Sequence, residues 1–206
     1  MAATMPPRHT LMGGRLCLDF CNTISERRGS HDDRLESYAD LVSWGWHAGF
    51  LNSEEATRLT RLCMSSPTES QAVWERAMCL REALTSIFCA AAEGRRMKAG
   101  ALDVLNFELT GAMARSEVVP TEAGYTWLWT ERGKALDCVL WPIARSAADL
   151  LTEGPLGAIR RCQGRACGCL FLDTSRNRSR RWCDMRICGN RAKARRHHQR
   201  VKAGAA

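Results

Sequence analysis

Acidic residues are scarce at the C-terminal end of this chain. Residues 156–206 hold two of them, Asp173 and Asp184, against twelve arginines and two lysines, a net charge of +12. The preceding 155 residues carry sixteen basic and twenty acidic side chains. This contrast predicts a boundary near Glu153–Pro155, with one domain over residues 1–153 and a basic module over residues 156–206. Such a field attracts polyanions, and the usual polyanion in a cell is nucleic acid.

Long apolar stretches are also missing. The longest uninterrupted apolar run, Ile87–Ala92, has six residues, too few to cross a bilayer. Residues 1–10 contain two prolines and no apolar segment typical of a secretory signal. We therefore expect a cytoplasmic protein with no membrane partner. In that reducing compartment the eleven cysteines are expected to bind metal or to pack as small apolar residues.

Motifs typical of enzymes are absent from the sequence. We find no P-loop, no nucleotide-binding glycine fingerprint, no H-E-x-x-H segment and no nucleophile paired with a base. The histidines before residue 155 are isolated from one another. We therefore expect that the protein is not an enzyme.

The first 155 residues predict a mainly α fold. Apolar residues recur at helical spacing over residues 34–50, 56–63, 71–93, 98–115 and 132–152. Asn52 and Glu55 form a predicted capping box, Gly94 is a predicted helix stop, and Pro142 is expected to kink its helix or to begin a second one. Residues 116–130 predict one small β-hairpin.

Four cysteines near the C-terminus form two pairs of the same spacing. Cys162 and Cys167 make one C-x4-C pair, Cys183 and Cys188 make another, and fifteen residues separate them. Two such pairs supply the four sulfurs of a tetrahedral metal site. We expect one structural Zn²⁺, since four thiolates leave no position open for catalysis; iron is the alternative metal.

The surroundings of these cysteines predict a zinc-ribbon-like module. Residues 158–161 and 169–172 are strand candidates for a short hairpin, and residues 190–201 predict a basic helix with Asn190 as its N-cap. Three side chains leave alternatives open. Cys169 either replaces Cys167 as a ligand or packs inside its strand, and His197 or His198 could compete as a ligand. The remaining six cysteines are expected to fill the core.

The basic side chains of the module are candidate contacts to nucleic acid. Arginine binds phosphate bidentately, and a basic helix fits a groove or follows a backbone. Trp182 either stacks on a base or covers the zinc site, and Asn190 either reads base edges or supports the ligands. The candidate residues are Arg176, Arg178, Arg180 and Arg181 in the loop, and Arg191, Lys193, Arg195, Arg196 and Arg200 in the helix.

Residues 171–193, which include Cys188-Gly189-Asn190-Arg191, resemble the CGNR zinc-finger family. Residues 13–23, Gly-Gly-Arg-Leu-Cys-Leu-Asp-Phe-Cys-Asn-Thr, are similar to the start of the accompanying ABATE domain. The resemblance implies a bacterial, stress-responsive transcription regulator, or an RNA-binding protein, in which Cys162, Cys167, Cys183 and Cys188 bind zinc. The chain departs from that family at Cys169, where an aromatic residue is common.

These observations favour a zinc-stabilised protein that binds DNA or RNA through its basic module and regulates transcription. Its helical domain would then sense a ligand or form a homodimer. Asp19, Asn22 and Thr23 are the candidate ligand site, and the alternative is that they brace the next helix. Two other functions use the same module: a redox sensor based on the zinc thiolates, and an adaptor that binds an acidic protein surface.

Overall fold

The computed structural model describes residues 11–27, 30–165 and 167–204. Residues 1–10, on which the expectation of no secretory signal rests, lie outside this range. The mainly α fold is confirmed, and no described helix combines the length and apolar character needed to span a membrane. The helices are α1 (Leu16–Cys21), α2 (Tyr38–His47), α3 (Ser53–Ser65), α4 (Pro67–Glu93), α5 (Ala101–Met113), α6 (Trp141–Thr152) and α7 (Asn190–Gly204).

Local signals set most helix ends as the sequence predicts. Asn52 and Glu55 form the capping box of α3 through hydrogen bonds of 2.9 and 2.8 Å. Gly94 ends α4 in the left-handed conformation, with φ of 62°. Pro142 lies in the first turn of α6, so it begins a new helix after the short 3-10 turn Leu136–Val139 instead of kinking a longer one.

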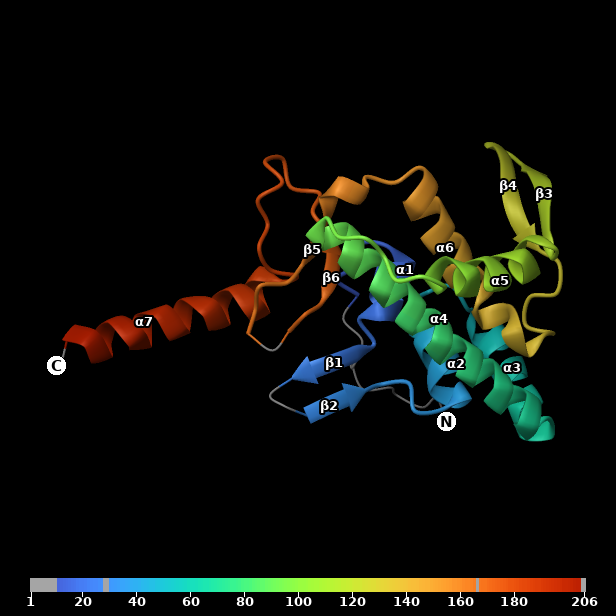
Figure 1. The fold of residues 1–206 in the computed structure, drawn as a ribbon. Coiled ribbons are helices and arrows are strands. Elements are labelled where there is room, and N and C mark those ends of the chain that lie inside the picture. Colours follow the sequence, from blue (N-terminus) through green and yellow to red (C-terminus); the bar gives the residue numbers. More distant parts are fainter. Residues whose placement is uncertain (1–10, 28–29, 166, 205–206) are drawn as a thin grey trace.

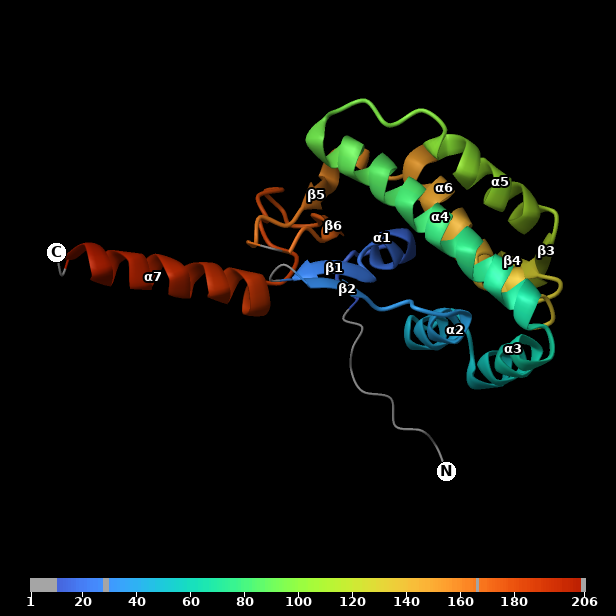
Figure 2. The same cartoon turned by 60° about the horizontal axis from the view of Figure 1, so that its bottom comes forward.

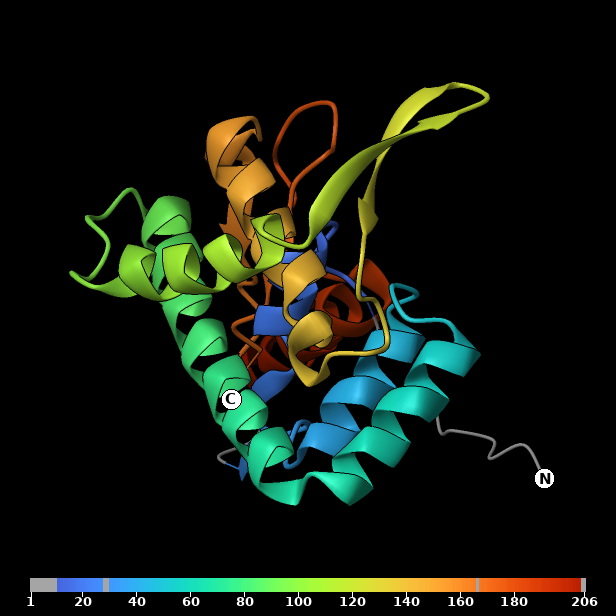
Figure 3. The ribbon, with the colours of Figure 1, turned by 90° about the vertical axis from the view of Figure 1, so that its right-hand side faces the viewer.

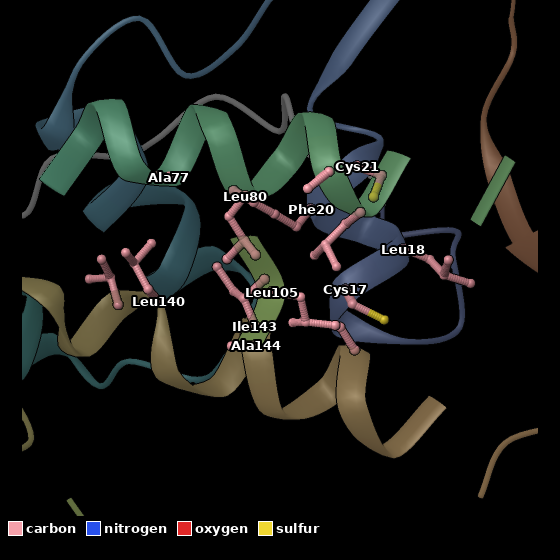
Figure 4. Packing of buried hydrophobic residues seen from close by; sticks show 14 of the residues in the cluster. Cys17, Leu18, Phe20, Cys21, Ala77, Leu80, Leu105, Leu140, Ile143 and Ala144 are labelled. Atoms are coloured by element: carbon pink, nitrogen blue, oxygen red, sulfur yellow. The ribbon is translucent and has the colours of Figure 1, made fainter. Parts of the chain in front are cut away.

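The core lies around α4, which runs along the length of the helical domain and contacts α1, α2, α3 and α5 (Figure 1). The short helix α1 lies between α4 and α6, as Figure 4 shows. Its Cys17, Leu18 and Phe20 are fully buried. Of the six cysteines predicted to fill the core, Cys17, Cys21 and Cys138 are buried, Cys63 and Cys89 are partly exposed, and Cys79 is exposed.

Two antiparallel hairpins belong to the helical domain, whereas the sequence predicts one. The predicted hairpin, β3 (Ser116–Thr121) with β4 (Gly124–Trp129), extends away from the helices (Figure 3). The hairpin that the sequence analysis missed pairs β1 (Ile24–Arg27) with β2 (Ser30–Asp33). These strands lack apolar alternation. A distant contact holds the end of β2, because Arg81 of α4 binds Asp33 bidentately at 2.7 and 2.5 Å.

The C-terminal module begins with the predicted hairpin, β5 (Ile159–Arg161) with β6 (Leu170–Leu172). This hairpin packs against α4 and α1, and Ile159, Leu170 and Leu172 join the main hydrophobic core. Beyond the metal-binding loops, α7 projects away from the body (Figures 1 and 2). At about 1.5 Å per residue, its fifteen residues extend about 22 Å.

The start of α7 differs from the prediction. Asn190 is not the N-cap, because its backbone is already helical at φ −66° and a π-helical turn, Met185–Gly189, precedes it. Asp184 caps this turn instead, and its carboxylate accepts hydrogen bonds from the N–H groups of Arg186 and Ile187 at 2.6 and 3.1 Å. The helix therefore continues directly from the turn that contains Cys188.

Candidate metal centre

The first cysteine pair lies on a tight turn at the end of β5. The Cys167 N–H donates to the Gly164 carbonyl at 3.1 Å and closes the turn. A Cβ atom on Gly164 would lie 3.1 Å from the Cys188 Sγ and 3.3 Å from the Cys167 Cβ. The absence of a side chain at Gly164 therefore lets the second cysteine pair approach the first. The spacing of the cysteines in the sequence does not show that a glycine is needed here.

The four sulfurs predicted to bind zinc converge. The Sγ atoms of Cys162, Cys167, Cys183 and Cys188 all lie within 4.8 Å of one another. The Cys167 Sγ lies 3.6 Å from that of Cys183, which lies 3.8 Å from that of Cys188. Four sulfurs placed tetrahedrally about 2.3 Å from a zinc ion are about 3.8 Å apart. The cluster thus has the size and the donor set of a structural zinc site.

Crowding gives the thiols of Cys167, Cys183 and Cys188 unequal acidities. Hydrogen bonds from Cys162, Cys169 and Cys183 hold the pKa of Cys167 far below its usual range. Side-chain interactions with Cys162, Cys167 and Cys169 raise the pKa of Cys183 far above it. Burial, followed by interactions with Cys167 and Cys162, raises the pKa of Cys188 to about 12. Ionisation of Cys167 thus disfavours ionisation of Cys183 and Cys188. A divalent cation that displaces the thiol protons would stabilise all of these thiolates together.

Backbone groups and a small second core support the sulfurs. The N–H groups of Gly164 and Cys183 both donate to the Cys162 Sγ at 3.4 Å. Phe171 is fully buried beside the cluster, and Met12, Trp182 and Ile187 pack around it. Trp182 is half-buried, which matches the covering role considered from the sequence.

The competing ligands occupy different positions. Cys169 is buried next to the cluster, with its Sγ 3.4 Å from that of Cys167, and it stands just before β6 instead of inside it. His197 and His198 are exposed on α7. In the described parts of the chain, the four cysteines are the one group of three or more cysteine, histidine or carboxylate side chains whose ligand atoms converge.

The loop that joins the cysteine pairs is organised by Asp173. Its buried carboxylate accepts hydrogen bonds from the Ser175 N–H and hydroxyl at 2.9 and 2.5 Å, and from the Arg180 N–H at 2.9 Å. Burial opposes ionisation of this carboxyl, but the hydrogen bonds hold its pKa below the ordinary value. Arg176 and Arg178 are left exposed at the tip of the loop.

Two arginines of this loop contact groups of the module itself, and their predicted contact with phosphate stays a prediction. The Arg180 guanidinium lies 4.7 Å from the centre of the Phe171 ring and donates to the carbonyls of Trp182 and Cys183. Arg181 donates to the Gln163 Oε1 at 2.7 Å and lies over the Trp182 ring. Sequence spacing alone could not separate these two from Arg176 and Arg178.

The basic residues of α7 divide into two groups. Arg191 and Arg195 line a small cavity that Cys167, Cys183 and Cys188 also line, so their charges lie near the sulfurs. A zinc ion held by four thiolates would carry a net charge of −2, which these two arginines would stabilise. Lys193, Arg196 and Arg200 are exposed, as is Asn190, whose side chain makes no hydrogen bond to any described residue.

Asp19, Asn22 and Thr23 all hydrogen-bond to other parts of the protein. Asp19 accepts hydrogen bonds from the N–H groups of Met12 and Gly13, both at 2.7 Å. The Asn22 side chain accepts from the Leu170 N–H and donates to the Leu170 carbonyl, both at 2.8 Å. Thr23 donates to the Phe20 carbonyl. Thr23 also accepts a hydrogen bond from Arg81 of α4 at 3.0 Å. These hydrogen bonds hold α1 to the preceding turn, to α4 and to β6, and none of them reaches the next helix, α2, so a brace of that helix and a ligand role both stay predictions.

Comparisons with known proteins agree with this geometry. The model of the ABATE family, described as "Putative stress-induced transcription regulator", matches residues 14–154, and that of the CGNR zinc finger matches residues 158–201. No curated protein matches the chain. The first match covers more than half of the sequence, and the second includes all four clustered cysteines. The chain therefore belongs to the ABATE family and carries a CGNR zinc finger at its C-terminal end.

Proposed function

We propose that this protein is a zinc-dependent transcription regulator that binds nucleic acid through α7. The projection of α7 from the metal centre carries the proposal (Figure 2). Every described side chain from His197 to Lys202 is exposed, so this part of the helix contributes nothing to a core of its own chain. A helix that is polar all round and held at one end is available to a partner.

The dimensions and charge of α7 suit a duplex groove. A helix with its side chains is about 10–12 Å across, close to the width of about 12 Å of the major groove of B-DNA. Lys193, Arg196 and Arg200 share one side, and Arg191 and Arg195 share the neighbouring side. Charges on more than one side allow contacts to the phosphates that flank a groove.

Zinc is required in this proposal because, among the described elements, α7 packs mainly against the π-helical turn that precedes it. The π-helical turn that contains Cys188 connects it to the body, and an isolated helix of fifteen residues is marginally stable in water. Metal binding would fix both the start and the direction of the helix.

Fluorescence anisotropy with duplex DNA, single-stranded DNA and single-stranded RNA, at about 50 and 200 mM salt, tests the proposal. We expect binding that weakens steeply with salt and is lost when zinc is chelated. Affinity no better than micromolar for every probe at low salt would count against it.

A charge-matched pair of triple variants locates the surface. We expect K193A/R196A/R200A to weaken binding and to lower the slope of log affinity against log salt by up to about 3 for a duplex. The control R61A/R96A/K98A removes the same charge from exposed positions on the helical domain. Equal losses in the two variants would indicate nonspecific attraction, and a loss confined to the control would place the binding surface elsewhere.

The metal centre also bears on enzymatic activity and on the competing adaptor function. We propose that the protein is not an enzyme, since four sulfurs fill the coordination positions of a tetrahedral zinc ion. An adaptor that binds an acidic protein through α7 is the competing function. Pull-downs that survive nuclease treatment, together with no binding to the three probes, would favour it.

A further inference from the structure

Cys169 supplies a fifth sulfur at the metal centre. Its Sγ lies 3.4 Å from the Cys167 Sγ, which in turn lies 3.6 Å from the Sγ of Cys183. Cys169 is as buried as Cys162, each with 6% of its surface exposed. The Cys169 sulfur is thus a buried neighbour of one predicted ligand, Cys167.

The spacing of these two sulfurs favours replacement over simultaneous binding. Two ligands of one tetrahedral zinc ion are about 3.8 Å apart. At 3.4 Å, Cys167 and Cys169 are closer than that, and Cys162, Cys183 and Cys188 already supply three vertices. One vertex therefore remains for the pair.

The backbone at Cys169 is fixed in a position that serves such a replacement. Its carbonyl accepts a hydrogen bond from the Cys162 N–H at 2.8 Å. The N–H and the carbonyl of the next residue, Leu170, both hydrogen-bond to the Asn22 side chain. Gly168, at φ 65°, makes the turn between the two cysteines. With the backbone held in this way, rotation about the Cα–Cβ bond is the movement left to the Cys169 sulfur.

We propose that Cys167 and Cys169 share the fourth ligand position of the zinc site, so that either thiolate completes the tetrahedron. In the exchange, one sulfur–zinc bond forms as the other breaks. The proton of the entering thiol passes to the leaving thiolate along their hydrogen bond, and the charge of the site is unchanged. The proposal rests on the zinc site and is independent of nucleic-acid binding.

The released sulfur would face an open space. Cys167 is partly exposed, whereas the other three sulfur ligands are buried. It lines a cavity of about 500 Å³ between α4 and the metal-binding turn, together with Cys169, Cys89 and Arg161. Exchange would thus expose one thiol to small thiol-reactive molecules while zinc stays bound.

Cobalt substitution tests the exchange, because the intensity of the thiolate-to-cobalt charge-transfer band reports the number of bound sulfurs. We expect C167S and C169S each to bind one metal with a four-thiolate band. We expect C167S/C169S to show a three-thiolate band and to bind zinc about 100-fold more weakly or worse, beyond the loss typical of a supporting residue. A three-thiolate band in C167S, equal to that of the double variant, would overturn the proposal.

Alkylation of the wild-type zinc-bound protein gives a second measurement that needs no variant to fold. With iodoacetamide, we expect one modified residue within the metal-binding turn, divided between Cys167 and Cys169, with zinc retained. The exposed Cys79 serves as an internal reference for alkylation. Zinc loss on the first modification in the turn, or modification of Cys79 alone, would contradict the exchange.

Discussion

At the residue scale, the metal centre depends on a position without a side chain. Gly164 lies where the two cysteine pairs meet, and a Cβ there would approach both Cys188 and Cys167 more closely than most real Cβ atoms approach a neighbour. Neither neighbour can yield freely, because both are ligands of the predicted zinc ion. The sulfur geometry is thus fixed by four cysteines and one glycine.

We expect Gly164→Ala to weaken zinc binding about 10-fold or more, the scale of losses when groups that support metal ligands are changed. The added methyl group forces the two pairs apart. Gly157→Ala is the matched control, because it lies in the same module with nothing within 4 Å of its ideal Cβ. Competition with a chelator of known affinity measures both, and equal affinities would show that the turn adapts.

At the scale of single elements, α7 shows how one carboxylate starts a helix. Asp184 satisfies two N–H groups of the π-helical turn, and its own carbonyl accepts from the N–H groups of Cys188 and Gly189 at 2.9 and 3.2 Å. The same turn presents Cys188 to the cluster. Helix initiation and metal binding therefore share one structural unit.

Replacing this cap should loosen α7. We expect Asp184→Ala to cost about 1 kcal/mol of helix stability, the usual value for a lost N-cap. Hydrogen exchange across residues 186–200 should become faster. Asp149→Ala, which removes one surface ion pair of α6, is the control. Unchanged exchange in Asp184→Ala would show that the metal alone fixes the start of the helix.

At the scale of the whole molecule, the helical domain and the zinc finger share one core. Asn22 pairs with the backbone of Leu170, and the Leu172 N–H donates to the Gly13 carbonyl at 2.8 Å. The segment that resembles the start of the ABATE domain thus hydrogen-bonds to the backbone of β6. A change in the helical domain can therefore reach the metal centre through this contact.

We expect zinc removal to lower the thermal stability of the helical domain as well as that of the finger. In Asn22→Ala this coupling should shrink, because the Leu170 N–H and carbonyl lose their partner, at a cost of about 1–3 kcal/mol. Differential scanning calorimetry with and without chelator measures it, and exposed Asn106→Ala is the control. A chelator effect as large in Asn22→Ala as in the wild type would refute the coupling.

Features that depend on local spacing can be predicted from the amino-acid order. Helical periodicity, the capping box at Asn52, the two cysteine pairs and the basic C-terminal module are all readable without coordinates, because each depends on residues near one another in the chain. Short polar strands such as β1 and β2 carry no such signal.

The contacts of single polar and sulfur-bearing residues depend on the three-dimensional fold. Asn22 hydrogen-bonds to the backbone of Leu170, 148 positions away, and the Arg180 guanidinium lies over the Phe171 ring. The Cys169 sulfur lies against that of Cys167, a predicted metal ligand. The same residue types at the same spacing could have faced solvent or a ligand. Which partner they meet depends on chain segments that folding brings together, and that information is absent from local sequence.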